Sequence, residues 1–346
     1  MRAYVVDSSA LHLWRRDMRG QWLLKKEAFD ALSDCPTSPK ELASLKLSEL
    51  ELGNAPVRLM VPSKELRISR HLYSYSVQPH ALPENAFRQL TAHICIASPE
   101  LCLLESASKL SLFQLIELCM ELCGKYALVP EAQRGCISRN YQLTSAKSID
   151  RFLQGVSHIH GIKKLRRAVQ FARDGSRSPM ETREYLFTCL PKRLGGYGLP
   201  PATLNARIDL SPAERRVAKR QYLECDECWP EQRVVVEYDG HNDHESRENR
   251  ARDAVKRNIL IARVYCHRQA DLRCACIRQS NSRHITSNRL SPQRFPARLG
   301  TAPLRSSSGA FHVIIKIRGR AIHTNAVPTS RKKQLAETAR PMNACI

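Results

Sequence analysis

Residues 223–244 read Leu-Glu-Cys-Asp-Glu-Cys-Trp-Pro-Glu-Gln-Arg-Val-Val-Val-Glu-Tyr-Asp-Gly-His-Asn-Asp-His. This stretch predicts a β-hairpin with strands over 223–228 and 233–239. The second strand is expected because Val234, Val235 and Val236 are β-branched, and Pro230 is typical of the turn between the strands. The hairpin is the most specific structural signal in the chain.

The register of the hairpin decides whether two acidic side chains meet. If Trp229 pairs with Val234, Asp226 lies directly opposite Glu237. Directly opposed side chains lie about 5 Å apart at Cβ, and like charges there destabilise a sheet. A divalent cation would neutralise the pair, since Mg²⁺ takes carboxylate oxygens at about 2.1 Å and keeps several waters. Two alternatives stay open: both acids are solvated on an exposed face, or the register is shifted by one residue.

The residues that follow the hairpin favour the metal-binding interpretation of the two acids. The second strand ends in Glu-Tyr-Asp-Gly, His241 and His244 come next, and an amphipathic basic helix is predicted over 245–260. This order resembles the PD-(D/E)XK nuclease superfamily, and within it the very-short-patch-repair branch. The resemblance covers residues 178–260, about a quarter of the chain.

The resemblance implies roles for three acids. Asp226 and Glu237 would bind Mg²⁺ or Mn²⁺ and take part in catalysis, and Glu181 would join them from a preceding helix. Glu181 also has a structural explanation, because Ser178, Pro179 and Glu181 form a capping box at a helix start. Capping alone accounts for a glutamate at that position.

One position departs from the superfamily pattern. The lysine expected two residues after the second acid is replaced by Asp239. Lys256, on the predicted helix, or His241 could take over the proton or the phosphate, which makes both candidate catalytic residues. The alternative is a decayed site that binds nucleic acid without cutting it.

The charge of the chain is consistent with a nucleic-acid partner, which we expect to be DNA. The chain has 55 basic and 33 acidic residues, a net charge of +22. Residues 263–346 hold 16 basic and two acidic residues, so +14 of the excess lies there and +8 in the first 262 residues. The candidate nucleic-acid contacts are Lys163, Lys164, Arg166 and Arg167 on an amphipathic helix predicted over 162–173, and Arg250 and Arg257 on the later helix. A solvated helix face is the alternative.

The last 80 residues show no regular pattern. Residues 267–346 lack the periodicity of a packed domain and the low complexity of a linker. A frameshifted or recombined C-terminus is slightly favoured over a disordered basic extension. We expect this basic tail to be irregular and to make few core contacts.

Thirteen cysteines without a recognisable signal peptide predict a reducing compartment, and hence a cytoplasmic location. No apolar run approaches the 18 or so residues of a membrane span, so no membrane association is expected. The Cys225–Cys228 spacing is typical of zinc ligands. Strand alternation would place the two thiols on opposite faces, which argues against a shared metal.

The first 150 residues predict a separate α+β unit. Strands are expected over 57–61, 72–77 and 93–98, and helices over 99–107 and 112–124, with Gly124 as the C-cap. The stretch over 94–104 resembles AbiEi-type antitoxins of abortive-infection systems. The whole pattern is similar to uncharacterised actinobacterial proteins that join an AbiEi-like front half to a nuclease-like back half. That likeness implies a defence or DNA-processing setting, with a cognate toxin or defence partner that the sequence does not identify.

The sequence therefore predicts an α/β protein with three parts: an α+β domain over 1–150, a PD-(D/E)XK-like α/β/α domain over 151–266, and the basic tail. Two functions follow. The first is a Mg²⁺-dependent DNA endonuclease that hydrolyses phosphodiester bonds. The second is a non-catalytic nucleic-acid-binding or antitoxin-like regulator on the same scaffold.

Overall fold

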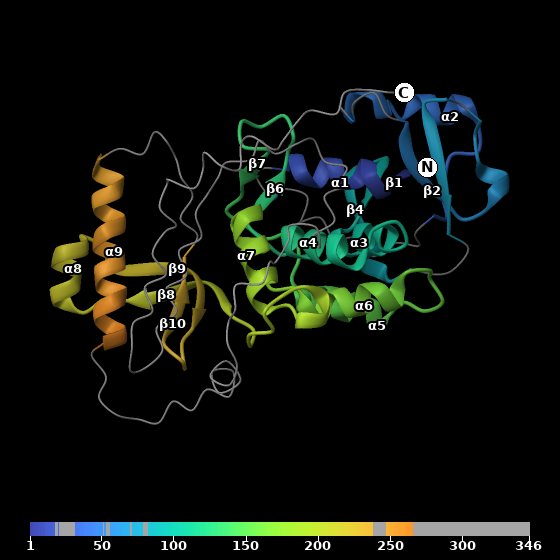
Figure 1. The fold of residues 1–346 in the computed structure, drawn as a ribbon. Coiled ribbons are helices and arrows are strands. Elements are labelled where there is room, and N and C mark those ends of the chain that lie inside the picture. Colours follow the sequence, from blue (N-terminus) through green and yellow to red (C-terminus); the bar gives the residue numbers. More distant parts are fainter. Residues whose placement is uncertain are drawn as a thin grey trace, which may run out of the picture.

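The computed structural model describes residues 1–17, 20, 32–50, 52, 56–69, 71–78, 82–237 and 247–265. They form a mixed α/β fold, with a five-stranded sheet at one end and a three-stranded sheet at the other (Figure 1). The predictions for Asp239, His241, His244 and residues 267–346 lie outside the described residues.

The five-stranded sheet has the order β3-β2-β1-β5-β4 and mixes parallel with antiparallel pairs. Its strands are β1 (Ala3–Val5), β2 (Val57–Val61), β3 (Tyr73–Val77), β4 (Phe87–Thr91) and β5 (Ile94–Ala97). The strands predicted over 57–61, 72–77 and 93–98 are thus confirmed.

Helices join this sheet to the second one. They are α1 (Asp7–Arg16), α2 (Pro39–Ser44), α3 (Pro99–Ala107), α4 (Leu112–Leu122), α5 (Ala146–Gln154), α6 (Ile162–Phe171) and α7 (Pro179–Cys189), with a small ribbon of β6 (Tyr126–Leu128) and β7 (Cys136–Ser138). Helices α3, α4, α5 and α6 pack on one another. The larger apolar core runs from Ala3 to Val236 and so continues past residue 150.

Gly124 has a different role from the predicted one. The C-cap of α4 is Cys123, and Gly124 follows it without a left-handed backbone. A Cβ at Gly124 would lie 2.6 Å from the carbonyl oxygen of Met120 and 2.7 Å from that of Ser176. Glycine is needed here because the backbone leading into α7 passes too close for any side chain.

The three-stranded sheet contains the predicted hairpin. Its strands are β8 (Thr203–Asp209), β9 (Tyr222–Trp229) and β10 (Val234–Val236), all antiparallel in the order β10-β9-β8. Trp229 pairs with Val234 and Glu227 with Val236, so the expected register is confirmed. Helix α8 (Pro212–Ala218) packs on α9 (Arg247–Tyr265), which is the predicted basic helix extended by one turn at its C-terminal end.

The side-chain alternation of β9 breaks next to Asp226. Cys225 and Cys228 both belong to a second, smaller core, which includes Ile259 and Leu260 of α9. Between them, Glu227 accepts a hydrogen bond from Thr188 of α7. Strict alternation would place Cys225 and Glu227 on one face, so the prediction that the two thiols lie on opposite faces is wrong.

The backbone of the neighbouring strand shows where this break arises. Leu204 pairs with Glu227 and Ala206 with Cys225, so Asn205 lies opposite Asp226. Asn205 has a φ of +49°, a left-handed conformation that asparagine tolerates better than most residues. This local distortion lies opposite the point where Glu227 turns towards α7.

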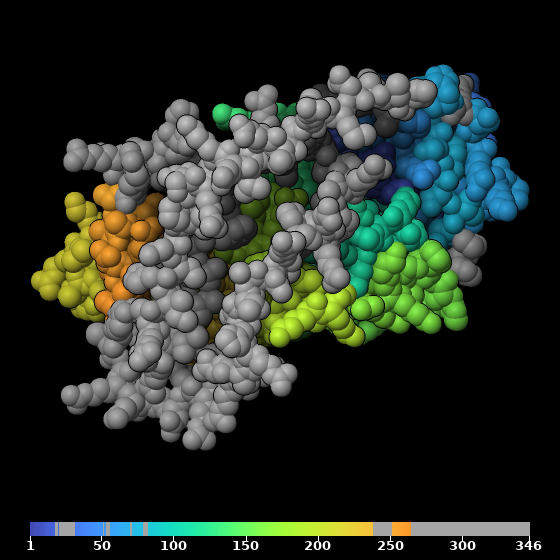
Figure 2. Space-filling model, in the orientation of Figure 1, coloured from blue at the N-terminus to red at the C-terminus, as the bar shows by residue number. Residues whose placement is uncertain are grey.

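The surface of the described residues extends from α8 and α9 at one end, in yellow and orange, to the N-terminal residues, in blue, at the other (Figure 2). Among the helices that the structure describes, none combines the length and the apolar character needed to cross a membrane.

Candidate active site

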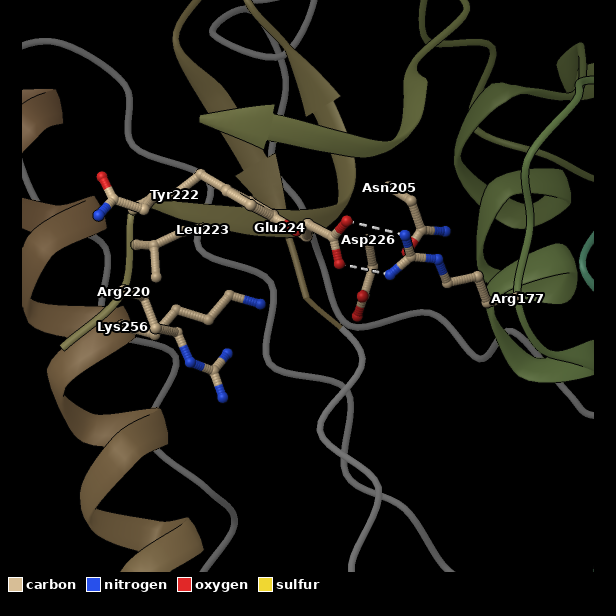
Figure 3. A pocket seen from close by; sticks show the side chains of 9 residues that line it. Arg177, Asn205, Arg220, Tyr222, Leu223, Glu224, Asp226 and Lys256 are labelled. Atoms are coloured by element: carbon tan, nitrogen blue, oxygen red, sulfur yellow. Dashed lines mark hydrogen bonds and ion pairs between the residues drawn. The ribbon is translucent and has the colours of Figure 1, made fainter. Parts of the chain in front are cut away.

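A polar cleft of about 460 Å³ lies on the second sheet, between α7 and α9. Its charged lining residues are Arg177, Arg220, Glu224, Asp226 and Lys256. Figure 3 shows Arg177 reaching Glu224 from one side, with Lys256 of α9 on the other. The cleft thus combines carboxylates with three basic side chains, the combination expected where a phosphate group and a cation meet.

Asp226 and Glu237 follow directly from the confirmed register. Glu227 pairs with Val236, so Asp226 and Glu237 are the residues that follow this last pair on the two strands. Burial and the Asp226 charge both raise the pKa of Glu237 above its ordinary value. Glu237 Oε1 is buried and has no hydrogen-bond partner among the described residues. The two acids therefore interact, and one carboxylate oxygen is left for a further ligand.

Lys256 reaches this acid pair from α9. Its Nζ donates to Glu237 Oε2 at 2.5 Å, and about a quarter of each side chain is exposed. Burial alone would lower the pKa of Lys256, but the charge and hydrogen bond of Glu237, together with the Asp226 charge, raise it overall. A protonated amine thus lies beside Glu237, although the position where the resemblance predicts a lysine is Asp239.

Glu181 lies in the first turn of α7, and its carboxylate already has hydrogen-bond donors. Ser178 caps the helix by accepting from the Glu181 backbone N–H. Glu181 Oε2 accepts from the Arg177 backbone at 2.9 Å, one residue before the position of a capping box, and from Asn205 Nδ2 at 2.7 Å. Burial and the Asp226 charge raise the pKa of Glu181. Glu181 therefore lies close to Asp226, and it also holds α7 against β8.

Two buried acids beneath the cleft were missed by the sequence analysis. Glu184 is 2% exposed and Glu227 is fully buried, and each has a carboxylate oxygen without a partner among the described residues. Burial, followed by the charges of Glu227 and Asp226, raises the pKa of Glu184 to about 8. Burial raises that of Glu227 to about 7. Glu184 could have been found, because it lies three residues after Glu181 on the same helix face.

These two acids predict a pH-dependent stability. The pKa of Glu184 rises from 4.5 to about 8 on folding, so the stability gained from its protonated form is complete below pH 4.5 and is lost as the pH rises through about 8. We expect the melting temperature to fall between about pH 4.5 and 8 in the presence of chelator, to level off above that range, and to fall less in Glu184→Gln. An identical decline in Glu184→Gln and in a control, Glu231→Gln in the exposed hairpin turn, would contradict this origin.

Arg177 and Glu224 form the side of the cleft nearest α7. Arg177 Nη1 and Nη2 donate to the two Glu224 oxygens at 2.5 and 2.8 Å. More than a third of each side chain is exposed, so the pair contributes little to stability. Its value lies in orientation, because a two-pronged contact fixes the guanidinium at the edge of the cleft. Nothing in the sequence pattern pointed to this pair.

The predicted basic helix is placed away from the cleft. Helix α6 packs beside α5, whereas α7 lies between it and the second sheet (Figure 1). Lys164 donates to the Leu110 carbonyl at 2.8 Å, and Arg166 donates to those of Leu153 and Val156. These side chains close neighbouring helix ends, a role consistent with packing.

The remaining candidates differ in how the structure places them. Lys163 and Arg167 are exposed on α6, and Arg257 is exposed on α9. Arg250 belongs to the first turn of α9, and His241 lies outside the described residues. Of the six predicted nucleic-acid contacts, the two on α9 share an element with the cleft residue Lys256.

Within the described ranges, no set of three or more His, Cys, Asp or Glu side chains is arranged to hold a metal ion. A pair of carboxylates is a different arrangement, and Mg²⁺ in proteins is commonly held by one or two carboxylates with waters completing its shell. Any ion at this site would thus depend on Asp226 and Glu237.

No protein-family model matches this chain, and neither the curated proteins nor the solved structures searched contain a match. The function therefore has to be inferred from the chemistry of the site.

Proposed function

We propose that this chain is a Mg²⁺-dependent DNA endonuclease with a PD-(D/E)XK-like site in the cleft of its second sheet. The observation that carries the proposal is the contact of Lys256 with Glu237 beside Asp226. Two acids and an amine, brought together from a hairpin and the following helix, are the side chains that phosphodiester hydrolysis requires.

The acid pair fits a divalent cation. Glu237 Oε1 is a buried acceptor without a donor, and the Asp226 charge already opposes ionisation of Glu237. A cation would provide a partner for Glu237 Oε1 and would offset the repulsion between the charges of Asp226 and Glu237. Mg²⁺ or Mn²⁺ held by Asp226 and Glu237 would supply the activation of water and the neutralisation of phosphate charge.

The protein's own residues would position the substrate. Lys256 would hold the phosphate that is cut, since its amine stays protonated. Arg220 and Arg177 line the same cleft and would contact the neighbouring phosphates. Buried Glu184 and Glu227 favour their neutral forms, which limits the negative charge that an incoming phosphate would meet.

A non-catalytic regulator is the second candidate, and one observation favours it. Asp239 replaces the superfamily's lysine, and Lys256 is already paired with Glu237. On this alternative, the cleft binds nucleic acid, with or without a protein partner such as a toxin, and the acid pair no longer serves hydrolysis.

Cleavage assays separate the two functions. The purified protein is incubated with plasmid and with single-stranded DNA in Mg²⁺, Mn²⁺ or chelator. The endonuclease is expected to nick DNA with either metal and to be inactive with chelator. Binding without cleavage under every condition would favour the regulator.

Lys256→Met tests the amine directly. We expect this substitution to lower the cleavage rate about a hundredfold, because a charge placed at the developing anion is lost. Lys219→Met, on the exposed turn after α8, is the matched control and should cut at nearly the wild-type rate. Equal rates for Lys256→Met and wild type would remove Lys256 from the mechanism.

A further inference from the structure

Tyr222 is the one aromatic residue among those that line the cleft in the described part of the chain. It is the first residue of β9, and 38% of it is exposed. In Figure 3 it lies at the end of the cleft away from Arg177. An exposed ring at the end of a charged cleft provides a flat apolar surface beside groups that attract phosphate.

Arg207 covers one side of this ring. Its Cζ lies 4.2 Å from the Tyr222 ring centroid, and its Nε donates to Asp209 at 2.9 Å. Tyr222 pairs with Asp209 and Arg207 pairs with Glu224, so the contact is a diagonal one between adjacent strands. The Arg207 guanidinium, which is oriented by Asp209, thus holds the Tyr222 ring in place. The ring forms a preorganised stacking surface.

The spacing along β9 gives the distance between the Tyr222 ring and the candidate metal ligand Asp226. Tyr222 and Asp226 are four residues apart, about 13 Å along a strand. That exceeds the 3.4 Å rise of one nucleotide step in duplex DNA. A base on Tyr222 would therefore belong to a different nucleotide from the one at Asp226.

Arg220 would supply a positive charge for the nucleic-acid backbone between Tyr222 and Asp226. It is exposed, lines the cleft, and makes no ion pair or hydrogen bond with the described residues. The preceding residue, Lys219, has a φ of +52° and ends α8, so the chain turns sharply at this point and brings Arg220 to the cleft. A guanidinium beside an aromatic ring suits a phosphate next to a base.

We propose that Tyr222 and Arg207 form a stacking platform for one unpaired base, and that the cleft takes single-stranded nucleic acid or a frayed end. This inference rests on the proposed function, since it names the form of nucleic acid that the same site accepts. A base inside a duplex is stacked on both faces and cannot lie on the ring. The cleft volume of about 460 Å³ is that of a small-ligand pocket, and a nucleotide is of suitable size to occupy it.

Binding in chelator tests the platform without requiring cleavage. Fluorescence anisotropy is measured with a labelled oligothymidylate and with a duplex of the same length. A second oligonucleotide carries 2-aminopurine, whose fluorescence is quenched when it stacks on an aromatic ring. Tyr222→Leu removes the aromatic face but keeps apolar bulk, and Tyr222→Phe keeps the face. Tyr197→Leu is the control, because Tyr197 is 52% exposed and contacts Phe187 but does not line the cleft.

The expected result is tighter binding of the single strand than of the duplex, and quenching in the wild type. Tyr222→Leu should weaken single-strand binding about tenfold and abolish the quenching, whereas Tyr222→Phe and Tyr197→Leu should behave like wild type. Unchanged binding by Tyr222→Leu, a loss shared by Tyr197→Leu, or preference for duplex would overturn the platform. Binding as expected without any metal-dependent cleavage would uphold the platform and defeat the endonuclease.

Discussion

Replacing Asp226 or Glu237 by alanine is expected to lower metal-dependent DNA cleavage by about a thousandfold or more. Each substitution removes one of the two carboxylates on which the proposed cation depends, and the proposed site has no third carboxylate to replace it. The variants should still fold, since Asp226 lines the cleft and Glu237 is about a quarter exposed. Initial rates of cleavage of plasmid and of single-stranded DNA, in Mg²⁺ and in Mn²⁺, provide the measurement.

Glu231→Ala is the matched control for these two variants. Glu231 is an exposed acid in the turn of the same hairpin, so its loss should leave the rate within about twofold of wild type. Cleavage that survives Glu237→Ala would point to a contaminating nuclease or to a site elsewhere in the chain.

Glu121→Ala is expected to cost about 3 kcal/mol of folding stability. The Glu121 side chain is 1% exposed. It accepts two hydrogen bonds from Arg15 at 2.8 and 2.7 Å and one from the Leu128 backbone at 3.0 Å. Removing it leaves a half-buried guanidinium and a backbone N–H without their acceptor, and breaking a buried pair in this way typically costs 3–5 kcal/mol.

Urea denaturation measures the loss, with Glu49→Ala as the control. Glu49 also forms an ion pair, with Lys46, but its side chain is 69% exposed, so the control should change stability by less than about 0.5 kcal/mol. A Glu121→Ala loss as small as this would show that α1 and α4 are held together by apolar packing alone.

The register of the hairpin could be predicted because several residues agree on it. Val234, Val235 and Val236 mark a strand and Pro230 marks the turn, so the pairing of Trp229 with Val234 could be expected, with a shift by one residue as the alternative. Lys256 could also be placed, since the apolar positions of the following helix fix which of its faces packs on the sheet. Strands and helices of the front half follow from equally strong local patterns.

Other features depend on contacts between distant segments, which local patterns do not encode. The break of alternation beside Asp226 lies opposite the left-handed backbone of Asn205, which is some 20 residues earlier in the sequence. The buried position of Glu227 depends on that break and on Thr188. The role of Gly124 depends on the Ser176 backbone, which only the folded chain brings close.

The basic helix shows the limit of reading charge from a sequence. Lys164 and Arg166 have the spacing of a solvated or phosphate-binding face, yet both donate to main-chain carbonyls at nearby helix ends. Long basic side chains serve both purposes equally well, and only the fold shows which carbonyls lie within reach.

Binding of Mn²⁺ is the most direct test of the central claim, that Asp226 and Glu237 together hold a divalent cation. The ion's electron paramagnetic resonance signal is strong when free and is lost on binding, so a titration counts sites without requiring cleavage. The wild type is expected to bind one ion, whereas Asp226→Asn and Glu237→Gln should bind none at the same concentration and the Glu231→Gln control should match wild type. Absence of binding by the wild type, or binding that both site variants retain, would contradict the claim.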